Sequence, residues 1–215
     1  MKLNVPLVRQ DKNSQECGLA GLAMIFKYYN VPISYEKLKI ELKADKTGTY
    51  MPQLGSYLIQ NGFEVEIISL HPKLFSLKDK NKKSVLNYFT SLYKKIKLKQ
   101  NKKVMSYFIK FLKDGGKIKV KIPDKQDIIT EIKNKRPICA LLTSNFLYRK
   151  KPGFNFHFNL VTGIDNKYVY VNDPLWNNNG GKKRYKISDF FYGVYASCYG
   201  DLDNASLMKI KKVRL

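Results

Sequence analysis

Cys17 stands at the start of an apolar segment whose length and composition predict a buried helix over about residues 17–30. Small and aliphatic residues cover nearly the whole circumference of that helix, which is typical of a helix enclosed on all sides. Unpaired N–H groups and the dipole at a helix N-terminus favour negative charge, and such a position often lowers the pKa of a thiol. Cys17 is therefore a candidate nucleophile. The alternative is a small buried hydrophobic residue, since cysteine is often fully buried.

His157 and Asp173 are the residues that could activate such a thiol. They lie on two β-rich runs, 157–164 and 168–174, around a turn at Asp165-Asn166, and this pattern predicts a hairpin. An even separation lets the two side chains share one face if the loop has an odd number of residues, for example three with a bulge. A two-residue turn would put them on opposite faces. On one face, the carboxylate can orient one ring nitrogen and leave the other for the sulfur.

Two stretches resemble the C39 cysteine peptidases. The first is Gln-Glu-Cys-Gly-Leu-Ala at 15–20, followed by Leu-Ala-Met-Ile and a tyrosine pair; the second is His-x-x-x-Val-Thr-Gly at 157–163, with Val-Tyr-Val-Asn-Asp-Pro at 169–174. Members of this family are papain-like enzymes that remove leader peptides after a Gly-Gly pair, often as the N-terminal domain of a peptide-exporting ABC transporter. The resemblance covers residues 1–70 and 130–200.

The resemblance implies an α+β papain-like fold, in which an N-terminal helical lobe with a central nucleophile helix packs on a C-terminal antiparallel sheet. It implies Cys17 as the nucleophile, His157 as general base and then acid, and Asp173 as the residue that orients the histidine. No cofactor or metal is expected.

The family also places a glutamine about six positions before the cysteine, where its amide shares the oxyanion hole with the cysteine N–H. Here that position is Asp11, and Gln10 is one residue further back. We expect a one-residue bulge in the 11–16 loop that lets Gln10 serve, with Gln15 as the other candidate. Loss of one such donor can cost about 100- to 1,000-fold in rate.

The middle of the chain departs from the family. From Lys78 to Lys121 there are fifteen lysines and two acidic residues, yet apolar residues recur at helical spacing. We predict two amphipathic helices, ended by Gly115-Gly116, within a Lys-rich insertion at 76–122 of a single domain spanning 1–215. The basic face is either a solvated surface, a surface for an acidic partner, an acidic substrate or a separate exporter, or a membrane-surface element.

The net charge of +23 raises the possibility of a nucleic-acid or anionic-membrane partner. The lysines are spread out and arginine, which leads in phosphate recognition, is scarce. The composition also suits an AT-rich genome, so a nucleic-acid partner is disfavoured. An odd number of cysteines without close spacing argues against a disulfide framework or a zinc site. No apolar run suits a secretory signal or a membrane span, so a cytoplasmic location is expected.

Three further expectations concern the rest of the chain. His71, which precedes a proline, is expected in a surface loop. Cys139 is expected in the core of a strand at 137–143. A last strand at 193–199 is expected to place Cys198 in the core, with the lysine-rich tail after it.

The sequence thus predicts a cysteine peptidase that cleaves peptides, with leader peptides or small peptides as its substrates. Two alternatives remain open. One is a non-catalytic C39-like domain that only docks peptides, although such domains typically lack the cysteine. The other is a papain-like acyltransferase that passes the acyl group to an amine.

Overall fold

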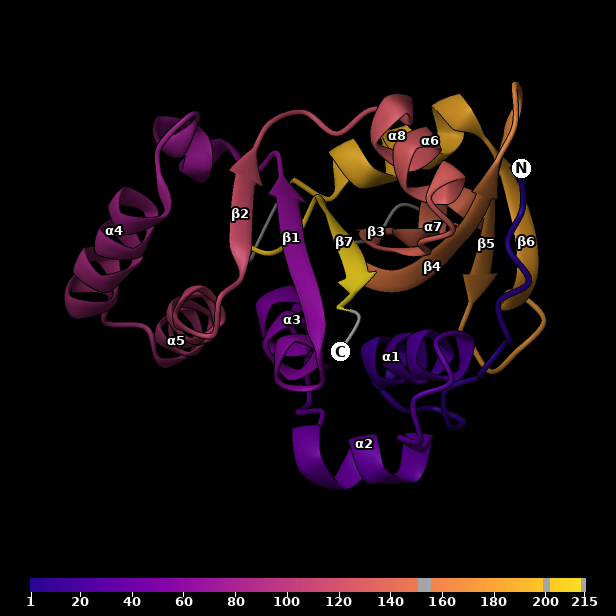
Figure 1. Cartoon of the computed structure of the whole chain (residues 1–215), viewed down its shortest axis with the longest axis horizontal. Coiled ribbons are helices and arrows are strands. Elements are labelled where there is room, and N and C mark those ends of the chain that lie inside the picture. Colours follow the sequence, from indigo (N-terminus) through magenta and orange to yellow (C-terminus); the bar gives the residue numbers. More distant parts are fainter. Residues whose placement is uncertain (151–155, 199–201, 214–215) are drawn as a thin grey trace.

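A seven-stranded sheet is the centre of the computed structural model, which describes residues 1–150, 156–198 and 202–213 (Figure 1). The strand order is β2-β1-β7-β3-β4-β5-β6. The strands are β1 (Phe63–Ser69), β2 (Lys117–Val120), β3 (Ile138–Thr143), β4 (Phe156–Ile164), β5 (Tyr168–Asp173), β6 (Gly181–Lys186) and β7 (Ser206–Lys212). Among these strands β1 and β2 pair in parallel and every other neighbouring pair is antiparallel.

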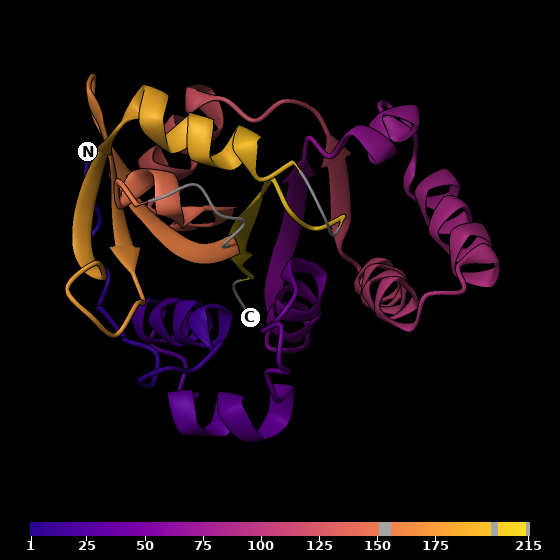
Figure 2. The ribbon, with the colours of Figure 1, turned by 180° about the vertical axis from the view of Figure 1, so that it is seen from behind.

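Helices cover both faces of this sheet (Figures 1 and 2). They are α1 (Cys17–Tyr28), α2 (Tyr35–Leu42), α3 (Met51–Gln60), the 3-10 helix η1 (Pro72–Leu77), α4 (Lys82–Lys95), α5 (Lys99–Lys113), α6 (Lys125–Lys133), α7 (Ser144–Leu147) and α8 (Ile187–Ala196). One core joins α1, α3, α4 and α5 to one face, and a second core joins α6 and α8 to the other. The predicted α+β papain-like architecture is confirmed. In the part of the chain that the structure describes, no helix is both long and apolar enough to cross a bilayer.

Helix α1 is buried along its length, as its composition predicts. Every residue from Gly18 to Phe26 is buried, so side chains of the helical lobe and the sheet enclose it on all sides. The neighbouring helices also begin and end where local signals place them. The Ser34 hydroxyl accepts a hydrogen bond from the backbone N–H of Lys37 at 3.1 Å and caps α2, and Gly62 has the positive φ of 83° expected just after a helix.

The lysine-rich segment forms α4 and α5, which lie beyond β2 at one end of the molecule (Figures 1 and 2). Their apolar faces pack together through the stacked rings of Phe89 and Phe108, whose centroids are 4.7 Å apart. The segment then returns to the sheet, where β2 pairs with β1 and sets Ile118 beside Ile67. This edge strand was not among the sequence predictions.

The predicted last strand at 193–199 is wrong. Helix α8 continues to Ala196, and its buried Phe190, Phe191 and Val194 recur at helical spacing against the sheet. The strand lies instead in β7, between β1 and β3, in the segment that the sequence suggested was a tail. Both faces of β7 are covered, since neighbouring Leu207 and Met208 enter different cores.

Two single-residue expectations are also corrected. His71 is 3% exposed, because its ring caps η1 by accepting a hydrogen bond from the Lys73 N–H at 3.3 Å. Cys198 follows α8 and is half-buried, with its thiol 3.6 Å from the carbonyl oxygen of Leu70. Cys139 is buried in the core, as predicted.

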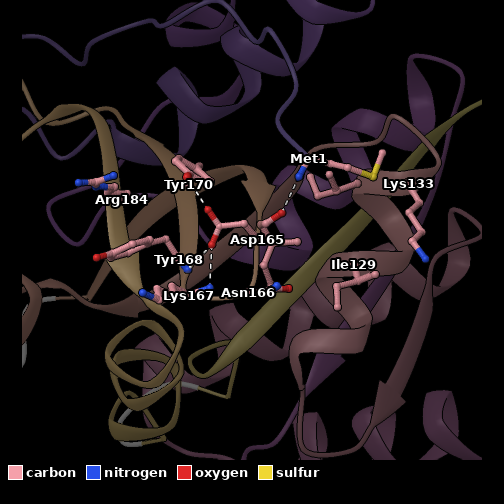
Figure 3. A pocket seen from close by; sticks show the side chains of 11 residues that line it. Met1, Ile129, Lys133, Asp165, Asn166, Lys167, Tyr168, Tyr170 and Arg184 are labelled. Carbon is pink, nitrogen blue, oxygen red and sulfur yellow. Dashed lines mark hydrogen bonds between the residues drawn. The ribbon is translucent and has the colours of Figure 1, made fainter.

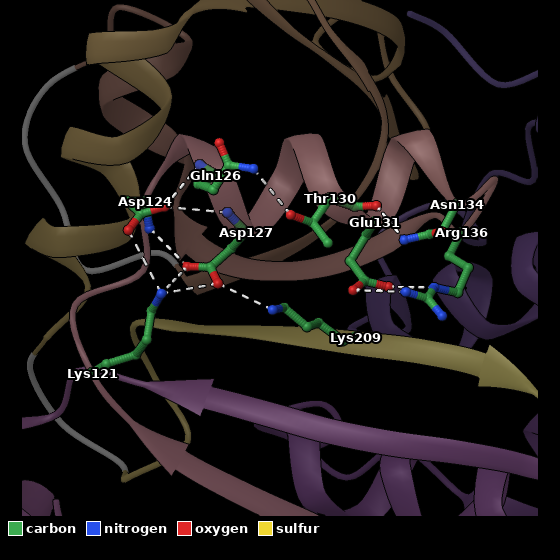
Figure 4. Close-up of polar contacts among 9 residues, drawn as sticks. All are labelled: Lys121, Asp124, Gln126, Asp127, Thr130, Glu131, Asn134, Arg136 and Lys209. Atoms are coloured by element: carbon green, nitrogen blue, oxygen red, sulfur yellow. Dashed lines mark hydrogen bonds and ion pairs between the residues drawn. The ribbon is translucent and has the colours of Figure 1, made fainter.

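An ionic cluster fastens α6 to the strand β7 beneath it (Figure 4). The carboxylate of Asp127 lies 2.8 Å from the Lys121 ammonium and 3.1 Å from that of Lys209. At the other end of the helix, Glu131 pairs with Arg136 at 2.6 Å. Both carboxylates are nearly buried, so these cations offset the cost of burying them.

Candidate active site

Helix α1 presents Cys17 at its first residue, as the sequence predicts. The Cys17 sulfur faces the imidazole of His157, which lowers the pKa of the thiol, and the backbone N–H groups of Phe158 and Gly18 lower this pKa further. Cys17 is partly buried, whereas Gly18 just after it is fully enclosed. A sulfur beside an imidazole and at the first residue of a helix is in a setting that favours a thiolate.

The β4–β5 hairpin turns over two residues, Asn166 and Lys167. Asp165 fixes this turn: its carboxylate accepts hydrogen bonds from the N–H groups of Lys167 and Tyr168, both at 2.7 Å, and from the Tyr170 hydroxyl at 2.6 Å (Figure 3). The turn thus lies one residue later than predicted. A two-residue turn by itself would leave the candidate histidine and carboxylate on opposite faces of the hairpin.

A β-bulge between Val161 and Gly163 changes that parity. It adds one residue, Thr162, to β4, and so reverses which face each earlier residue of β4 shares with β5. His157 and Asp173 therefore project from the same face. The two turn residues and the one bulge residue together make three unpaired residues between the strands. This odd number is the condition under which the two side chains share a face.

The N-terminal arm, residues 1–10, lies along the hairpin at the bulge. The backbone N–H of Leu3 donates to the carbonyl oxygen of Thr162 at 2.7 Å. At Gly163 a Cβ would lie 2.6 Å from a backbone oxygen of the arm, so only glycine permits this approach. Further along, the Gln10 N–H donates to the carbonyl oxygen of Pro174 at 2.8 Å. The arm therefore brings Gln10 to the end of β5.

Asp173 receives three hydrogen bonds and is fully buried. Its Oδ1 lies 2.8 Å from His157 Nε2 and accepts from the Leu175 N–H at 2.9 Å, while Oδ2 accepts from the Tyr148 hydroxyl at 2.5 Å. Since Nε2 faces Asp173, Nδ1 is the ring nitrogen left for the sulfur. Arg9 steadies the loop after Asp173 by donating to the carbonyls of residues 175–177 at 2.9–3.1 Å.

Tyr148 is a site residue that the sequence analysis missed. The basic residues of the segment 146–152 predict a loop, whereas this segment begins inside the short helix α7, and Tyr148 follows the end of that helix. Residues 151–152 lie outside the described residues. No local pattern pairs a tyrosine with an aspartate 25 positions later on another element. The only cue was an aromatic hydroxyl shortly before the strand that carries the histidine.

The pKa shifts of the three side chains favour a negatively charged Cys17 and Asp173 and a positively charged His157. Burial by itself raises the pKa of Cys17, but the hydrogen bond and charge of His157 outweigh it and lower the pKa below its usual value. Burial likewise disfavours charged His157, but hydrogen bonds with Asp173 and Cys17 raise its pKa to about 10. For Asp173, burial is outweighed by His157 and Tyr148, and the pKa is lowered. The site thus favours a thiolate beside an imidazolium.

Selective alkylation is the expected consequence of this ion pair. Near neutral pH, iodoacetamide should modify Cys17 before Cys198, because burial raises the pKa of Cys198 and a protonated thiol reacts poorly. The rate at Cys17 should fall as the pH drops through its lowered pKa. Peptide mapping by mass spectrometry after timed labelling measures both rates in one sample, and faster labelling of Cys198 would contradict the ion pair.

Gln10 is buried, but its side chain is directed at the loop that precedes Cys17. Its Nε2 donates to the carbonyl oxygen of Ser14 at 2.6 Å. The loop contains a turn from Asp11 to Ser14, with Asn13 at a positive φ of 59°. An amide nitrogen has two hydrogens, so one remains for an oxyanion. Gln15 is exposed.

Gly18 leaves no room for a side chain beside the nucleophile. A Cβ there would lie 2.2 Å from Thr49 Oγ1 and 2.8 Å from Leu54 Cδ1. We expect Gly18→Ala to destabilise the protein by about 1–3 kcal/mol. Gly21→Ala, one turn later with nothing within 4 Å of its Cβ, should be neutral or stabilising by up to about 1 kcal/mol. Urea unfolding of both variants tests this, and equal effects would contradict the close packing at Gly18.

The side chains of this site do not form a set of metal ligands. Across residues 1–150, 156–198 and 202–213, no three histidine, cysteine, aspartate or glutamate side chains gather so that they could hold a metal ion. The neighbouring thiol, imidazole and carboxylate can instead perform nucleophilic chemistry on their own.

Three solved structures with a similar fold are described as peptidases or peptidase domains. A double glycine motif protease from an AMS/PCAT transporter, in complex with the leader peptide, is 16% identical, covers 99% of this chain and 94% of its own, and gives a TM-score of 0.51. A protein from Bacillus anthracis described as a C39-like peptidase is 13% identical, covers 100% of both chains and gives 0.56. The peptidase domain of Streptococcus ComA, a bi-functional ABC transporter in quorum sensing, is 16% identical, covers 98% and 100%, and gives 0.53. At these identities the likeness establishes the fold.

A search of curated proteins found no match. The sequence profile of the Peptidase_C39 like family, in contrast, matches residues 2–202. This match spans both the helical lobe with α1 and the sheet that carries His157, and it agrees with the fold of the three solved peptidases. The chain therefore belongs to the Peptidase_C39 like family.

Proposed function

We propose that this chain is a cysteine peptidase that cleaves peptide bonds with a Cys17–His157–Asp173 triad. The observation that carries the proposal is the gathering of sulfur, imidazole and carboxylate: His157 lowers the pKa of the Cys17 thiol, and its Nε2 lies 2.8 Å from Asp173. A non-catalytic member of the family would have no need for a cysteine whose pKa is lowered by a buried histidine.

The reaction would be acyl transfer to water. The Cys17 thiolate attacks the carbonyl carbon of the peptide bond, and the negative charge moves to the carbonyl oxygen. His157 then gives the proton on its sulfur-facing nitrogen to the departing amine, while Asp173 keeps the ring oriented. Water, deprotonated by the same nitrogen, attacks the thioester and releases the acid with the thiol.

The oxyanion would be held by the Cys17 N–H and the Gln10 amide. The N–H of a first helical residue has no partner inside its helix, so that of Cys17 is available to a substrate. Gln10 supports this role through its burial and its anchorage beside Pro174. It would contribute through the hydrogen that its bond to Ser14 leaves free.

The substrate that we propose is a leader peptide or another small peptide. One structural neighbour is a double glycine motif protease in complex with the leader peptide, and another is the peptidase domain of a transporter. By analogy, a separate exporter is a candidate partner. A reactive thiol that must stay reduced suits the cytoplasm. We also propose that 76–122 is an elaboration of a single domain, since its β2 pairs within the common sheet.

A peptide-library cleavage screen, read by mass spectrometry, tests the proposal. The expected result is cleavage at a defined sequence that Cys17→Ala abolishes. Cleavage by the alanine variant would overturn the proposal. Peptide binding without cleavage by the unaltered chain would instead identify a docking domain. Amide products in the presence of added amines would identify an acyltransferase.

A further inference from the structure

A small apolar hollow lies where the α4–α5 hairpin meets η1. It has a volume of about 280 Å³, at the lower limit of the 300–1,000 Å³ or so of clefts that hold drug-sized ligands, and so suits a side chain rather than a large molecule. Its apolar lining is Leu92, Ile96, Val104, Met105 and Leu202, and its polar lining is Lys73, Lys95 and Asn101.

Among the described residues, the lysines around this hollow have no acidic partners. Five exposed lysines lie in and around the α4–α5 turn without a carboxylate at ion-pair distance in the part of the chain that the structure describes; they are Lys94, Lys95, Lys97, Lys99 and Lys102. The lysines beside α6, in contrast, are neutralised by Asp127 (Figure 4). Lys99 and Lys102 lie at i, i+3 in α5, where like charges repel each other, so an anionic ligand at this turn would relieve that repulsion.

We propose that this hollow, the lysine pocket, binds an acidic segment of the peptide substrate and encloses one apolar side chain of that segment. Carboxylates on either side of the apolar residue would meet Lys73 and Lys95, which are both exposed at the rim. The pocket thus offers an apolar floor and a cationic rim to a ligand with the complementary pattern. The assignment of the ligand as substrate rests on the proposed function.

Contacts connect the lysine pocket to the nucleophile. The first turns of α5 line the pocket and also hold the 45–50 loop, through an ion pair between Lys103 and Asp45 at 2.5 Å and a hydrogen bond between Gln100 and the Tyr50 hydroxyl. Thr49 of the same loop packs against Gly18, beside the sulfur. A peptide anchored at the pocket would therefore be held by the element that supports the loop next to Cys17.

A membrane surface fits these residues less well than a peptide. Membrane-surface helices expose a broad apolar face, but the large apolar side chains of α4 and α5 are committed to the core: Phe89, Phe108 and Phe111 are 0% exposed. On the hairpin, Leu98 stands out at 68% exposed. One leucine at a turn gives little area for insertion into lipid.

Binding of a fluorescent acidic peptide with one central leucine is the direct test. The full chain should bind it, and the affinity should fall at least about tenfold when the glutamates become glutamines, or when Lys73 and Lys95 are both changed to glutamate. The matched control is Lys182→Glu with Lys186→Glu on β6, where both lysines are exposed. It makes the same change in net charge and should leave binding intact. Asn101→Trp should remove the preference for leucine over glycine without any change in charge.

Equal loss in the two double variants would overturn the proposal, because it would mean that overall charge alone drives binding. Binding to phosphatidylserine vesicles that Lys73→Glu with Lys95→Glu abolishes, with no binding of the peptide, would also overturn it in favour of a lipid surface. A cleavage assay distinguishes the failure of the lysine pocket from the failure of the proposed peptidase activity. A short neutral substrate should be cut equally well by the pocket variant, whereas peptide binding without any cleavage by the unaltered chain would retain the pocket and reject the peptidase.

Discussion

Replacement of His157 with alanine is expected to lower peptide cleavage by about 10⁴- to 10⁶-fold, the scale on which the loss of a triad base acts. The same change should raise the pKa of Cys17. His157 is the largest of the influences that lower that pKa, and without it the effect of burial, which raises the pKa, has less to oppose it. Alkylation of Cys17 should therefore slow at neutral pH and recover only as the pH rises.

The control is His71→Ala, which removes the other histidine of the chain. His71 is buried and caps η1, so its loss should cost about 0.5–2 kcal/mol of stability and leave the reactivity of Cys17 unchanged. Circular dichroism establishes that both variants are folded. A Cys17 that alkylates equally fast with and without His157 would show that the imidazole does not govern the thiol.

Local sequence signals account for much of the helical lobe because each signal is contained in a few residues. The burial of α1 follows from its own composition, and the start of α2 follows from the Ser34 cap. The lysine-rich helices α4 and α5 were predicted in the same way, from apolar residues at helical spacing. These features depend little on the rest of the chain.

The features that could not be predicted from the sequence, or were predicted wrongly, depend on residues that are distant in the chain. The bulge at Thr162 decides whether His157 and Asp173 share a face, and the N-terminal arm fastens to the hairpin at that bulge. The segment of β7 looked like a basic tail because the neutralisation of Lys209 by Asp127 is visible only in three dimensions. In both cases the deciding partner is far away in the sequence.

Substitutions at Asp173 should separate the orientation of His157 from the charge that faces it. Asp173→Ala removes the acceptor of the Nε2 hydrogen bond and should lower cleavage by about 10³- to 10⁴-fold. Asp173→Asn keeps an oxygen that can accept from Nε2 and from the Leu175 N–H. An imidazolium carries hydrogens on both nitrogens, so no wrong tautomer arises in the resting pair. The rate of cleavage by the asparagine variant should therefore fall by only about 10- to 100-fold, which is the effect of losing one charge-assisted hydrogen bond.

Tyr148→Phe tests the same carboxylate from its other oxygen. Without the hydroxyl that donates to Oδ2, the pKa of Asp173 should rise, because the carboxylate loses a donor that stabilises its charge. The more basic carboxylate stays ionised and stabilises the imidazolium more strongly, so the alkaline limit of cleavage, set by loss of the His157 proton, moves above about pH 10. We expect roughly a tenfold loss in rate. A structural role of Tyr148 alone would lower stability without moving that limit. Tyr192→Phe, at an exposed tyrosine whose ring packs on Phe146 of α7, removes a hydroxyl from the neighbouring α8 and should leave the pH profile in place. An unshifted profile for Tyr148→Phe would mean that Asp173 holds His157 without help from the tyrosine.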